Sequence, residues 1–253
     1  MNFKGNTILI TGGGSGIGRG IAEAFHTLGN QVIIAGRRQS ILDETTAANP
    51  GMQSIILDIE QAGGIQSFAA DVVEKFPALN VLLNNAGIMR IEKLKSDPVD
   101  LANAEAIVAT NLLGPIRLTA ALLPHLRSKA AAAVINVSSG LAFVPLSLTP
   151  TYCATKAAIH SYSQSLRWQL KSTAVEVIEI IPPYVQTDLM SGAEDPRAMP
   201  LKEYIAETMA LLTQQPTPAE IVVERVKPLR LAAESGKYDA VFNGLNSAMA
   251  GEE

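Results

Sequence analysis

Short apolar runs alternate along the chain with longer segments in which apolar residues recur every third or fourth position. The runs include TILI, QVIIA and AVINV, which lack the alternation of apolar and polar residues found in half-exposed strands. Continuous apolar runs are typical of strands in a parallel sheet that is covered on both faces. The longer periodicity is typical of the helices that cover such a sheet. The pattern therefore predicts strands and helices in alternation.

The positions of these elements predict the fold class. Strands are expected at residues 7–10, 32–35, 54–57, 79–83, 132–137, 175–180 and 238–242. Helices are expected at about 17–28, 40–48, 61–76, 99–127, 151–171 and 218–234. Repeated strand–helix–strand units with right-handed crossovers predict an α/β fold, a Rossmann-like doubly wound parallel sheet of about seven strands with helices on both faces. No linker or internal repeat interrupts the pattern, so residues 1–253 are expected to form a single domain.

The segment 187–218 departs from this pattern because it is rich in Met, Pro, Gly and acidic residues. It is long for a connection within a compact domain, and long connections often close over a binding site. We therefore expect a substrate lid at 187–218, the alternative being a surface excursion that gates nothing.

Composition argues against several classes of protein. The net charge of −4 provides no basic surface for nucleic acid or an anionic membrane. The apolar runs fall short of the ~20 residues of a membrane span, and the start MNFKGNTILITGG lacks the pattern of a signal peptide. The single cysteine, Cys153, permits no internal disulfide and fits a reducing compartment, where we expect a small packed thiol. The sequence thus predicts a cytoplasmic protein that binds neither nucleic acid nor membrane.

A glycine-rich turn, TGGGSGIG, lies between the first predicted strand and the first predicted helix. Glycine at Gly12, Gly16 and Gly18 permits a tight turn, a close approach of pyrophosphate to the backbone, and close packing of helix on strand. The amino end of the helix would offer free N–H groups and partial positive charge to phosphates. The turn predicts a dinucleotide site that also includes Gly14, Ser15 and Ile17.

The end of the second strand favours NADP(H) over NAD(H). A carboxylate at this place would bind a ribose 2′-hydroxyl, whereas an arginine would accommodate a 2′-phosphate. The sequence here is Gly36-Arg37-Arg38, without an acid. Guanidinium groups bind phosphate in a bidentate manner, so Arg37 and Arg38 are expected at the cofactor. The alternatives are that both arginines start a solvated helix, or that the cofactor is NAD(H).

Two further groups of polar or small residues follow the third and fourth strands. Asp58, with Ile59 beside it, is placed to reach an adenine, and Asn84-Asn85-Ala86-Gly87 would allow a backbone to pass close to a ligand. Taken singly, such residues are more often caps or turns. Their common place at the carboxyl ends of parallel strands favours cofactor contacts by Asp58, Ile59, Asn85, Ala86 and Gly87.

Tyr152 and Lys156 lie four residues apart at the start of a predicted helix, so both side chains share a face. An ammonium beside a phenol favours the phenolate and would lower the pKa of Tyr152, making it a general acid or base near neutral pH. A Tyr-x-x-x-Lys spacing alone arises by chance on a solvated helix.

Together these motifs resemble the classical short-chain dehydrogenases/reductases over essentially the whole chain. The resemblance rests on TGGGSGIG, Asp58, NNAG, Asn111, Ser139 and Tyr152-x-x-x-Lys156, in the order of that family. It implies that Tyr152 exchanges a proton with the substrate oxygen and that Lys156 lowers the pKa of Tyr152 and holds the nicotinamide ribose. It further implies that Ser139 binds the substrate oxygen and that Asn111 helps to hold a relay water.

The resemblance extends to the region after the sixth strand. Pro182, Val185 and Thr187 are in place to contact the carboxamide of the cofactor, although Pro183 replaces the glycine usual in the family. The double proline and Gly36-Arg37 are similar to a bacterial branch associated with teichoic-acid D-alanylation operons. Members of the family commonly form homodimers or homotetramers, which is the assembly expected here.

Apolar residues near these motifs indicate the substrate class. The candidates for substrate contact carry no positive charge; they are Met89, Leu141, Phe143, Val144, Tyr184, Leu189 and Met190. We expect an oxidoreductase that acts on an uncharged, fairly hydrophobic ketone, aldehyde or secondary alcohol, without a metal. A different class, a catalytically silent dinucleotide-binding redox sensor, remains as the alternative, although Ser139, Tyr152 and Lys156 are all present.

Overall fold

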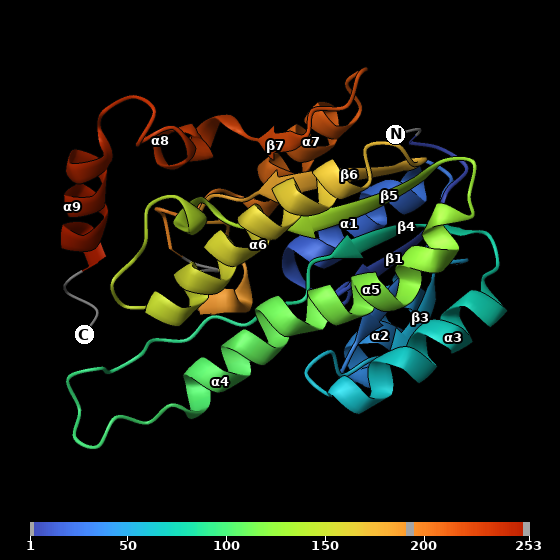
Figure 1. The fold of residues 1–253 in the computed structure, drawn as a ribbon, viewed down its shortest axis with the longest axis horizontal. Helices are drawn as coiled ribbons and strands as arrows, with labels where there is room; N and C mark the ends of the chain where they lie inside the picture. The colour runs from blue at the N-terminus through green and yellow to red at the C-terminus, as the bar shows by residue number, and fades with distance from the viewer. Residues whose placement is uncertain (1–2, 191–194, 250–253) are drawn as a thin grey trace.

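A seven-stranded parallel sheet forms the centre of the computed structural model, which describes residues 3–190 and 195–249 (Figure 1). The sheet order is β3-β2-β1-β4-β5-β6-β7. The strands are β1 Thr7–Thr11, β2 Gln31–Gly36, β3 Gln53–Ile56, β4 Leu79–Asn84, β5 Ala132–Val137, β6 Val175–Ile181 and β7 Glu220–Val222. The chain reverses its direction of winding between β1 and β4, which opens a crevice at the carboxyl ends of these strands.

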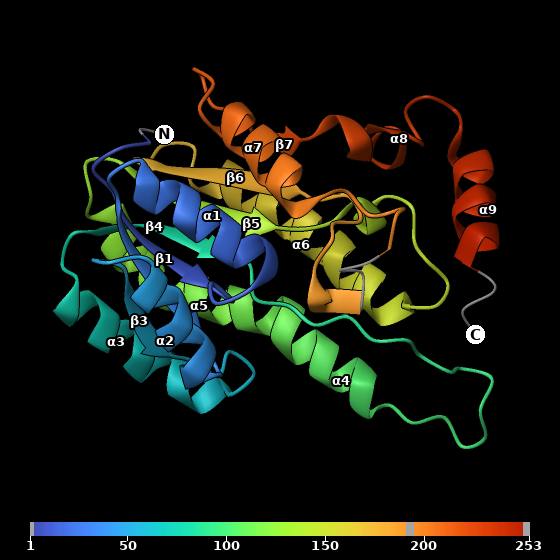
Figure 2. The ribbon, with the colours of Figure 1, turned by 180° about the vertical axis from the view of Figure 1, so that it is seen from behind.

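Helices cover both faces of the sheet, as Figures 1 and 2 show from opposite sides. One face carries α1, α2 and α7, and the other carries α3, α5 and α6. The α-helices of the described part are α1 Gly16–Thr27, α2 Gln39–Ala48, α3 Ile65–Lys75, α4 Ala102–Val108, α5 Gly114–Arg127, α6 Pro150–Gln169, α7 Leu201–Leu212, α8 Lys227–Arg230 and α9 Tyr238–Met249. A π-helical turn, Ala109–Leu113, joins α4 to α5.

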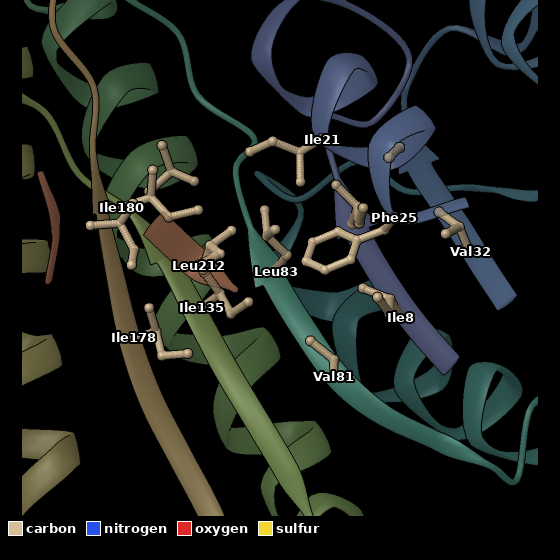
Figure 3. Close-up of a cluster of buried hydrophobic side chains, with 14 of the residues drawn as sticks. Ile8, Ile21, Phe25, Val32, Val81, Leu83, Ile135, Ile178, Ile180 and Leu212 are labelled. Atoms are coloured by element: carbon tan, nitrogen blue, oxygen red, sulfur yellow. The ribbon is translucent and has the colours of Figure 1, made fainter. Parts of the chain in front are cut away.

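The two faces hold separate apolar cores because the strands are apolar on both sides. Figure 3 shows the core beneath α1 and α7, where Ile21, Phe25 and Leu212 meet residues of β1, β4, β5 and β6. Each of these three side chains is fully buried, and burying a side chain of this size contributes roughly 1.5–3 kcal/mol. The cores hold the sheet rigid and thereby fix the positions of the loops at its carboxyl edge.

The predicted fold class and the first six strands are confirmed, whereas the prediction for the carboxyl-terminal part was wrong. The seventh strand is β7, which pairs with β6, and residues 238–242 begin helix α9 instead of forming a strand. Pro228 lies within the helix predicted at 218–234, and a proline cannot continue a helix from its preceding turn. The chain there forms β7, a 3₁₀ turn at Glu224–Val226 and the short α8.

The segment 187–218 is not a continuous loop. It contains α7, which packs on α1 and buries Tyr204 and Leu212 completely. The described residues of the segment before and after α7, 187–190, 195–200 and 213–218, belong to no α-helix or strand. Residues 191–194 lie outside the described residues.

One helical stretch of the described part, Ala102–Arg127, is long and apolar enough to cross a membrane by length and composition alone. Six residues of α5 are buried, and this helix contacts α3, β4 and β5. The stretch is therefore a core helix of the domain.

Candidate active site

A cavity of about 500 Å³ lies at the carboxyl ends of the strands, where the topology predicts a ligand. One end is formed by the glycine turn together with Arg37 and Arg38, and the other by Ser139, Tyr152 and Lys156. The residues expected to bind the cofactor and the residues expected to catalyse the reaction thus line the same cavity.

The glycine turn packs so closely on its neighbours that a side chain has no room at Gly12 or Gly18. A Cβ atom on Gly12 would lie 2.9 Å from the Ala86 Cα, and one on Gly18 would lie 2.3 Å from the Gly12 carbonyl oxygen. Gly16 has a φ of +51°, which favours glycine. Gly12, Gly14, Ser15, Gly16 and Ile17 line the cavity, whereas Gly18 packs behind them.

The amino end of α1 completes this cradle. Ser15 is the N-cap residue, but its side chain makes no capping hydrogen bond, and no acidic residue lies in the first turn. The first backbone N–H groups of α1 are therefore available to an anion, in keeping with the partial positive charge of a helix amino terminus. The residues present fit the phosphates of a dinucleotide.

Thr11 anchors this cradle to the loop after β4, a role that sequence reasoning missed. Its Oγ1 accepts hydrogen bonds from the backbone N–H groups of Asn85 and Ala86, both at 3.1 Å. In return, the Asn85 side-chain amide donates to the carbonyl oxygens of Thr11 at 3.1 Å and Gly12 at 3.3 Å. In the sequence, the only sign of this role is that Thr11, a hydroxyl residue, ends an otherwise apolar strand.

The cavity wall at the end of β2 carries positive charge. Arg37 and Arg38 are exposed and line the cavity, and neither guanidinium bonds to another residue of the described part of the chain. A Cβ on the preceding Gly36 would make only ordinary contact, 3.6 Å from Leu42 Cδ2. These arginines are free to bind a charged ligand group.

Asp58 is placed differently from Ile59. Ile59 lines the cavity, as do Asn85, Ala86 and Gly87. The Asp58 side chain does not line it, and its Oδ1 accepts a hydrogen bond from the Glu60 N–H at 3.2 Å. Asp58 thus has the turn-capping arrangement that the sequence analysis had kept as an alternative.

Ser139, Tyr152 and Lys156 are brought together as predicted, and all are buried beside the cavity. Ser139 follows β5, and its Oγ accepts a hydrogen bond from the Leu141 N–H at 3.1 Å. Tyr152 and Lys156 occupy successive turns of α6, with the lysine Nζ 5.5 Å from the centroid of the phenol ring. The arrangement places a hydroxyl, a phenol and an ammonium at one end of the cavity.

Burial alters the titration of both α6 groups. It raises the pKa of Tyr152 above its ordinary value, while the Ser139 side chain acts in the opposite sense. The net pKa of the phenol is thus above its ordinary value, because removal of the phenolate from water outweighs the effects that lower the pKa. Burial also lowers the pKa of Lys156 to about 8, although the charge of Glu179 opposes this change.

Asn111 lies in the π-helical turn, a feature often found at functional sites. Its Oδ1 accepts from the Ile88 N–H at 2.9 Å and its Nδ2 donates to the Ile88 carbonyl oxygen at 2.8 Å. Both polar atoms of the Asn111 side chain are thereby paired with the Ile88 backbone, which holds the loop after β4 against the π-helical turn.

The predicted substrate residues divide into two groups. Met89, Leu141, Tyr184 and Leu189 line the cavity, whereas Phe143 and Val144 do not. The last two predictions were wrong because the 3₁₀ turn Gly140–Ala142 directs the following residues into the protein: Val144 is fully buried, and the Phe143 ring packs edge-on against His160. The side chain of Met190 lies outside the described residues.

The loop after β6 lies across the cavity as expected. Pro182, Val185 and Thr187 all line it, and Thr187 Cγ2 would lie 3.3 Å from a Cβ on Gly16. This contact brings the loop after β6 directly against the glycine turn.

The carboxyl-terminal helices contribute cavity residues that the sequence did not reveal. Leu229 of α8 and Leu245 and Met249 of α9 line the cavity together with Leu146. Asn246 fastens α9, because its Oδ1 accepts from the Ser147 N–H at 2.7 Å and its Nδ2 donates to the Pro145 carbonyl oxygen at 3.1 Å. In the sequence, the only sign of α9 is the helical spacing of its apolar residues Val241, Leu245 and Met249.

Cys153 is buried, as expected for a packed thiol. Its Sγ accepts a hydrogen bond from the Leu146 N–H at 3.3 Å, and burial raises its pKa. A raised pKa disfavours the thiolate, so this cysteine is not an activated nucleophile.

Comparison with known proteins agrees with this geometry. Residues 6–198 match the family model described as short chain dehydrogenase. The "Uncharacterized oxidoreductase DltE" of Bacillus subtilis is 38% identical over 252 residues, which cover 98% of this chain and 99% of that protein.

Solved structures share the fold. A short chain dehydrogenase from Burkholderia cenocepacia in complex with NADP has a TM-score of 0.81 at 25% identity and covers 97% of this chain and 99% of its own. A short chain dehydrogenase/reductase from Burkholderia phymatum in complex with NAD has a TM-score of 0.81 at 20% identity, with coverage of 94% and 96%. The family match and the relative show that this chain belongs to the short chain dehydrogenase/reductase family, the NAD(P)-dependent oxidoreductases that transfer hydride.

Proposed function

We propose that the protein is an NADP(H)-dependent carbonyl reductase for uncharged, apolar ketones or aldehydes. The observation that carries the proposal is the single cavity with Ser139, Tyr152 and Lys156 at one end and Arg37 and Arg38 at the other. This arrangement supplies a proton donor and an oxygen-binding hydroxyl in one place and a phosphate-binding charge in another.

The residues of the site have distinct tasks in a reduction. NADPH, when bound, supplies the hydride that is added to the carbonyl carbon. The Tyr152 hydroxyl donates its proton to the carbonyl oxygen as negative charge develops there, and Ser139 stabilises that charge by a hydrogen bond. Lys156, as an ammonium, stabilises the phenolate that remains until Tyr152 regains a proton. The raised pKa of Tyr152 keeps the phenol protonated before the reaction, which suits a proton donor.

The cofactor preference is argued from charge. Arg37 and Arg38 line the cavity at the end of β2, and Gly36 brings no carboxylate that would repel a ribose 2′-phosphate. Solved relatives of the same fold are described with NADP or with NAD. The charge of the two arginines therefore supports NADP(H) over NAD(H).

The substrate class is argued from the lining of the cavity. Around Tyr152 the wall is apolar, with Met89, Leu141, Leu245 and Met249 among its residues. The charged residues of the described part that line the cavity are Arg37, Arg38, Lys156 and Asp188. Arg37 and Arg38 would be engaged by the cofactor, and the Lys156 ammonium donates to the Val137 carbonyl oxygen. The substrate end therefore offers no further positive charge to a carboxylate or phosphate, and Asp188 would repel one.

The remaining expectations belong to the same proposal. The irregular chain that begins at Thr187 would act as a lid, because Thr187, Asp188 and Leu189 line the cavity. The enzyme would be a single-domain homodimer or homotetramer in the cytoplasm. The exposed Trp168, with 71% of its surface accessible, offers apolar area on α6 for such an assembly.

The proposal is tested by measuring consumption of NADPH and NADH with a panel of aliphatic and aromatic ketones and aldehydes, including carboxylated analogues. We expect turnover of uncharged members with NADPH and a lower kcat/KM for each carboxylated analogue. Binding of NADPH without turnover of any carbonyl would instead favour a silent dinucleotide-binding protein.

A further inference from the structure

A buried carboxylate lies next to the catalytic residues without having a task in the reaction described above. Glu179 belongs to β6, a strand otherwise buried and apolar except for the exposed Glu176, and its own side chain is fully buried. Its Oε1 accepts a hydrogen bond from the Ser138 hydroxyl at 2.5 Å, and its Oε2 lies 2.8 Å from His160 Nδ1. A carboxylate at such a place is unfavourable unless its oxygens are paired, and both oxygens are.

The partners of Glu179 form a continuous chain from the protein surface to the cavity wall. The Gln164 amide nitrogen lies 3.1 Å from His160 Nε2. A His160 tautomer with its proton on Nδ1 donates to Glu179 and accepts from Gln164, so one protonation pattern satisfies every contact. The chain ends at Ser138, which lines the cavity and directly precedes Ser139.

Two opposite charges therefore hold the end of β5 that carries Ser139. The Lys156 Nζ donates to the Val137 carbonyl oxygen at 2.8 Å, while Glu179 accepts from the side chain of the next residue, Ser138. Lys156 and His160 are neighbours on successive turns of α6. The two charges thus bind consecutive residues immediately before the catalytic serine.

The other charges around Glu179 are already paired. Glu220 of β7 lies directly opposite Glu179 in the sheet register, and its carboxylate binds Arg230 at 2.8 Å. Arg167 of α6 donates to the carbonyl oxygens of Val177 and Ala219. His160, Glu179 and Glu220 place ligand-type atoms within 4.8 Å of one another, but the Glu220 carboxylate is already paired with the Arg230 guanidinium. Among the described residues, the charge left for Glu179 to balance is the Lys156 ammonium.

We propose that Glu179 is a positioning residue of the active site, which fixes the Ser138 hydroxyl beside Ser139 and supplies the buried negative charge that balances the Lys156 ammonium. The inference rests on the proposed reductase function, because turnover reports the position of Ser139 and the charge of Lys156. The geometry agrees with the electrostatics, since Glu179 raises the pKa of Lys156 against the effect of burial. A negative charge favours the protonated form of every group near it.

The decisive variant is Glu179→Gln, which keeps the shape and removes the charge. Its amide oxygen can accept from His160 and its NH₂ can donate to the Ser138 oxygen, so both contacts are retained. Loss of the negative charge makes Lys156 give up its proton more easily. We expect the pH profile of kcat/KM for carbonyl reduction to move to lower pH by roughly one unit, with NADPH affinity at the wild-type value.

Two further variants separate charge from structure. Glu176→Gln makes the same change of charge on the exposed side of β6, and we expect its profile to coincide with that of the wild type. Ser138→Ala leaves the Glu179 charge in place and removes the contact, so we expect kcat to fall by roughly tenfold to a hundredfold without a shift of the profile. Ser138→Ala also tests the positioning role if Glu179→Gln does not fold.

The outcomes are distinguishable. An active wild type whose profile is unchanged in Glu179→Gln, or a Ser138→Ala variant with wild-type kcat, overturns this inference while leaving the reductase function intact. A wild type that reduces no carbonyl contradicts the proposed function, and this inference with it. The expected pair of results, a shifted profile in Glu179→Gln and a lowered kcat in Ser138→Ala, establishes both halves of the role.

Discussion

The Lys156 Nζ lies 5.5 Å from the centroid of the Tyr152 ring, one turn further along α6, and is directed to the Val137 carbonyl oxygen. An ammonium at this place favours the phenolate, and being already protonated it cannot take the phenol proton. Burial raises the pKa of Tyr152 and lowers that of Lys156 to about 8. The resting site therefore holds a protonated phenol, which is the form that reduction of a carbonyl requires.

The pKa of Lys156 predicts the alkaline limit of activity. Its pKa of about 8 lies below the ordinary 10.5 because burial disfavours the ammonium. The ammonium is thus present below that pH and is lost above it, so stabilisation of the phenolate declines as the pH rises. We expect kcat/KM for carbonyl reduction to fall above about pH 8. A profile of kcat/KM that is flat to pH 10 would show that the charge of Lys156 does not limit the reaction.

The positive charge at the end of β2 predicts the cofactor preference. The double variant Gly36→Asp, Arg37→Ser places a carboxylate where a Cβ has room, 3.6 Å from Leu42 Cδ2. We expect NADPH affinity, measured by fluorescence titration, to fall at least roughly tenfold, because a charge-assisted contact contributes about 1.5–3 kcal/mol. NADH affinity should stay the same or increase. Arg127→Ser, a neutralised exposed arginine at the end of α5, is the control; equal losses of NADPH affinity would refute the assignment.

The close approach at Gly18 predicts a loss of stability and of cofactor binding. Its Cβ in Gly18→Ala would lie 2.3 Å from the Gly12 carbonyl oxygen, so the glycine turn must shift. Overpacking of this kind costs about 1–3 kcal/mol, and we expect a lower melting temperature and weaker NADPH binding. Gly63→Ala has no atom within 4 Å of the new Cβ and serves as the matched control. Wild-type melting and binding in Gly18→Ala would contradict the packing described.

The contribution of α9 to the cavity predicts an effect confined to the substrate. Leu245→Asp places a charge in the apolar wall, whereas Ser247→Asp places the same charge on the exposed side of the helix. We expect the first variant to raise KM for an apolar ketone roughly tenfold or more, since desolvating an unpaired charge is costly. NADPH affinity should remain unchanged in both. Equal KM values for the two variants would show that α9 does not contribute to the substrate site.

The sheet and the catalytic residues could be predicted because their signals are local. β1 to β6 each contain a short apolar run, and helical periodicity alone places Tyr152 and Lys156 on one face. β7 has only three residues and includes Glu220, so no run marks it. Residues 238–242 resemble a strand in a short window, and only the continued spacing to Leu245 and Met249 indicates a helix.

The parts of the site that sequence could not predict depend on tertiary packing. Leu229, Leu245 and Met249 reach the cavity only because the carboxyl-terminal helices return to it. Val144 follows the 3₁₀ turn Gly140–Ala142, and the pattern of apolar residues does not predict into which part of the protein this turn directs the chain. Glu176 and Glu179 look alike in the sequence VEVIEII, yet one is exposed and the other is buried against Ser138 and His160.

The most direct test of the central claim compares Tyr152→Phe with the wild type, using NADPH and a ketone that the wild type reduces. The substitution removes the proton donor and little else, because the ring remains packed on α6. We expect NADPH consumption to fall at least roughly a hundredfold, the low end of the contribution of a general acid, while the Kd for NADPH changes less than twofold. Turnover at the wild-type rate by Tyr152→Phe would contradict the account.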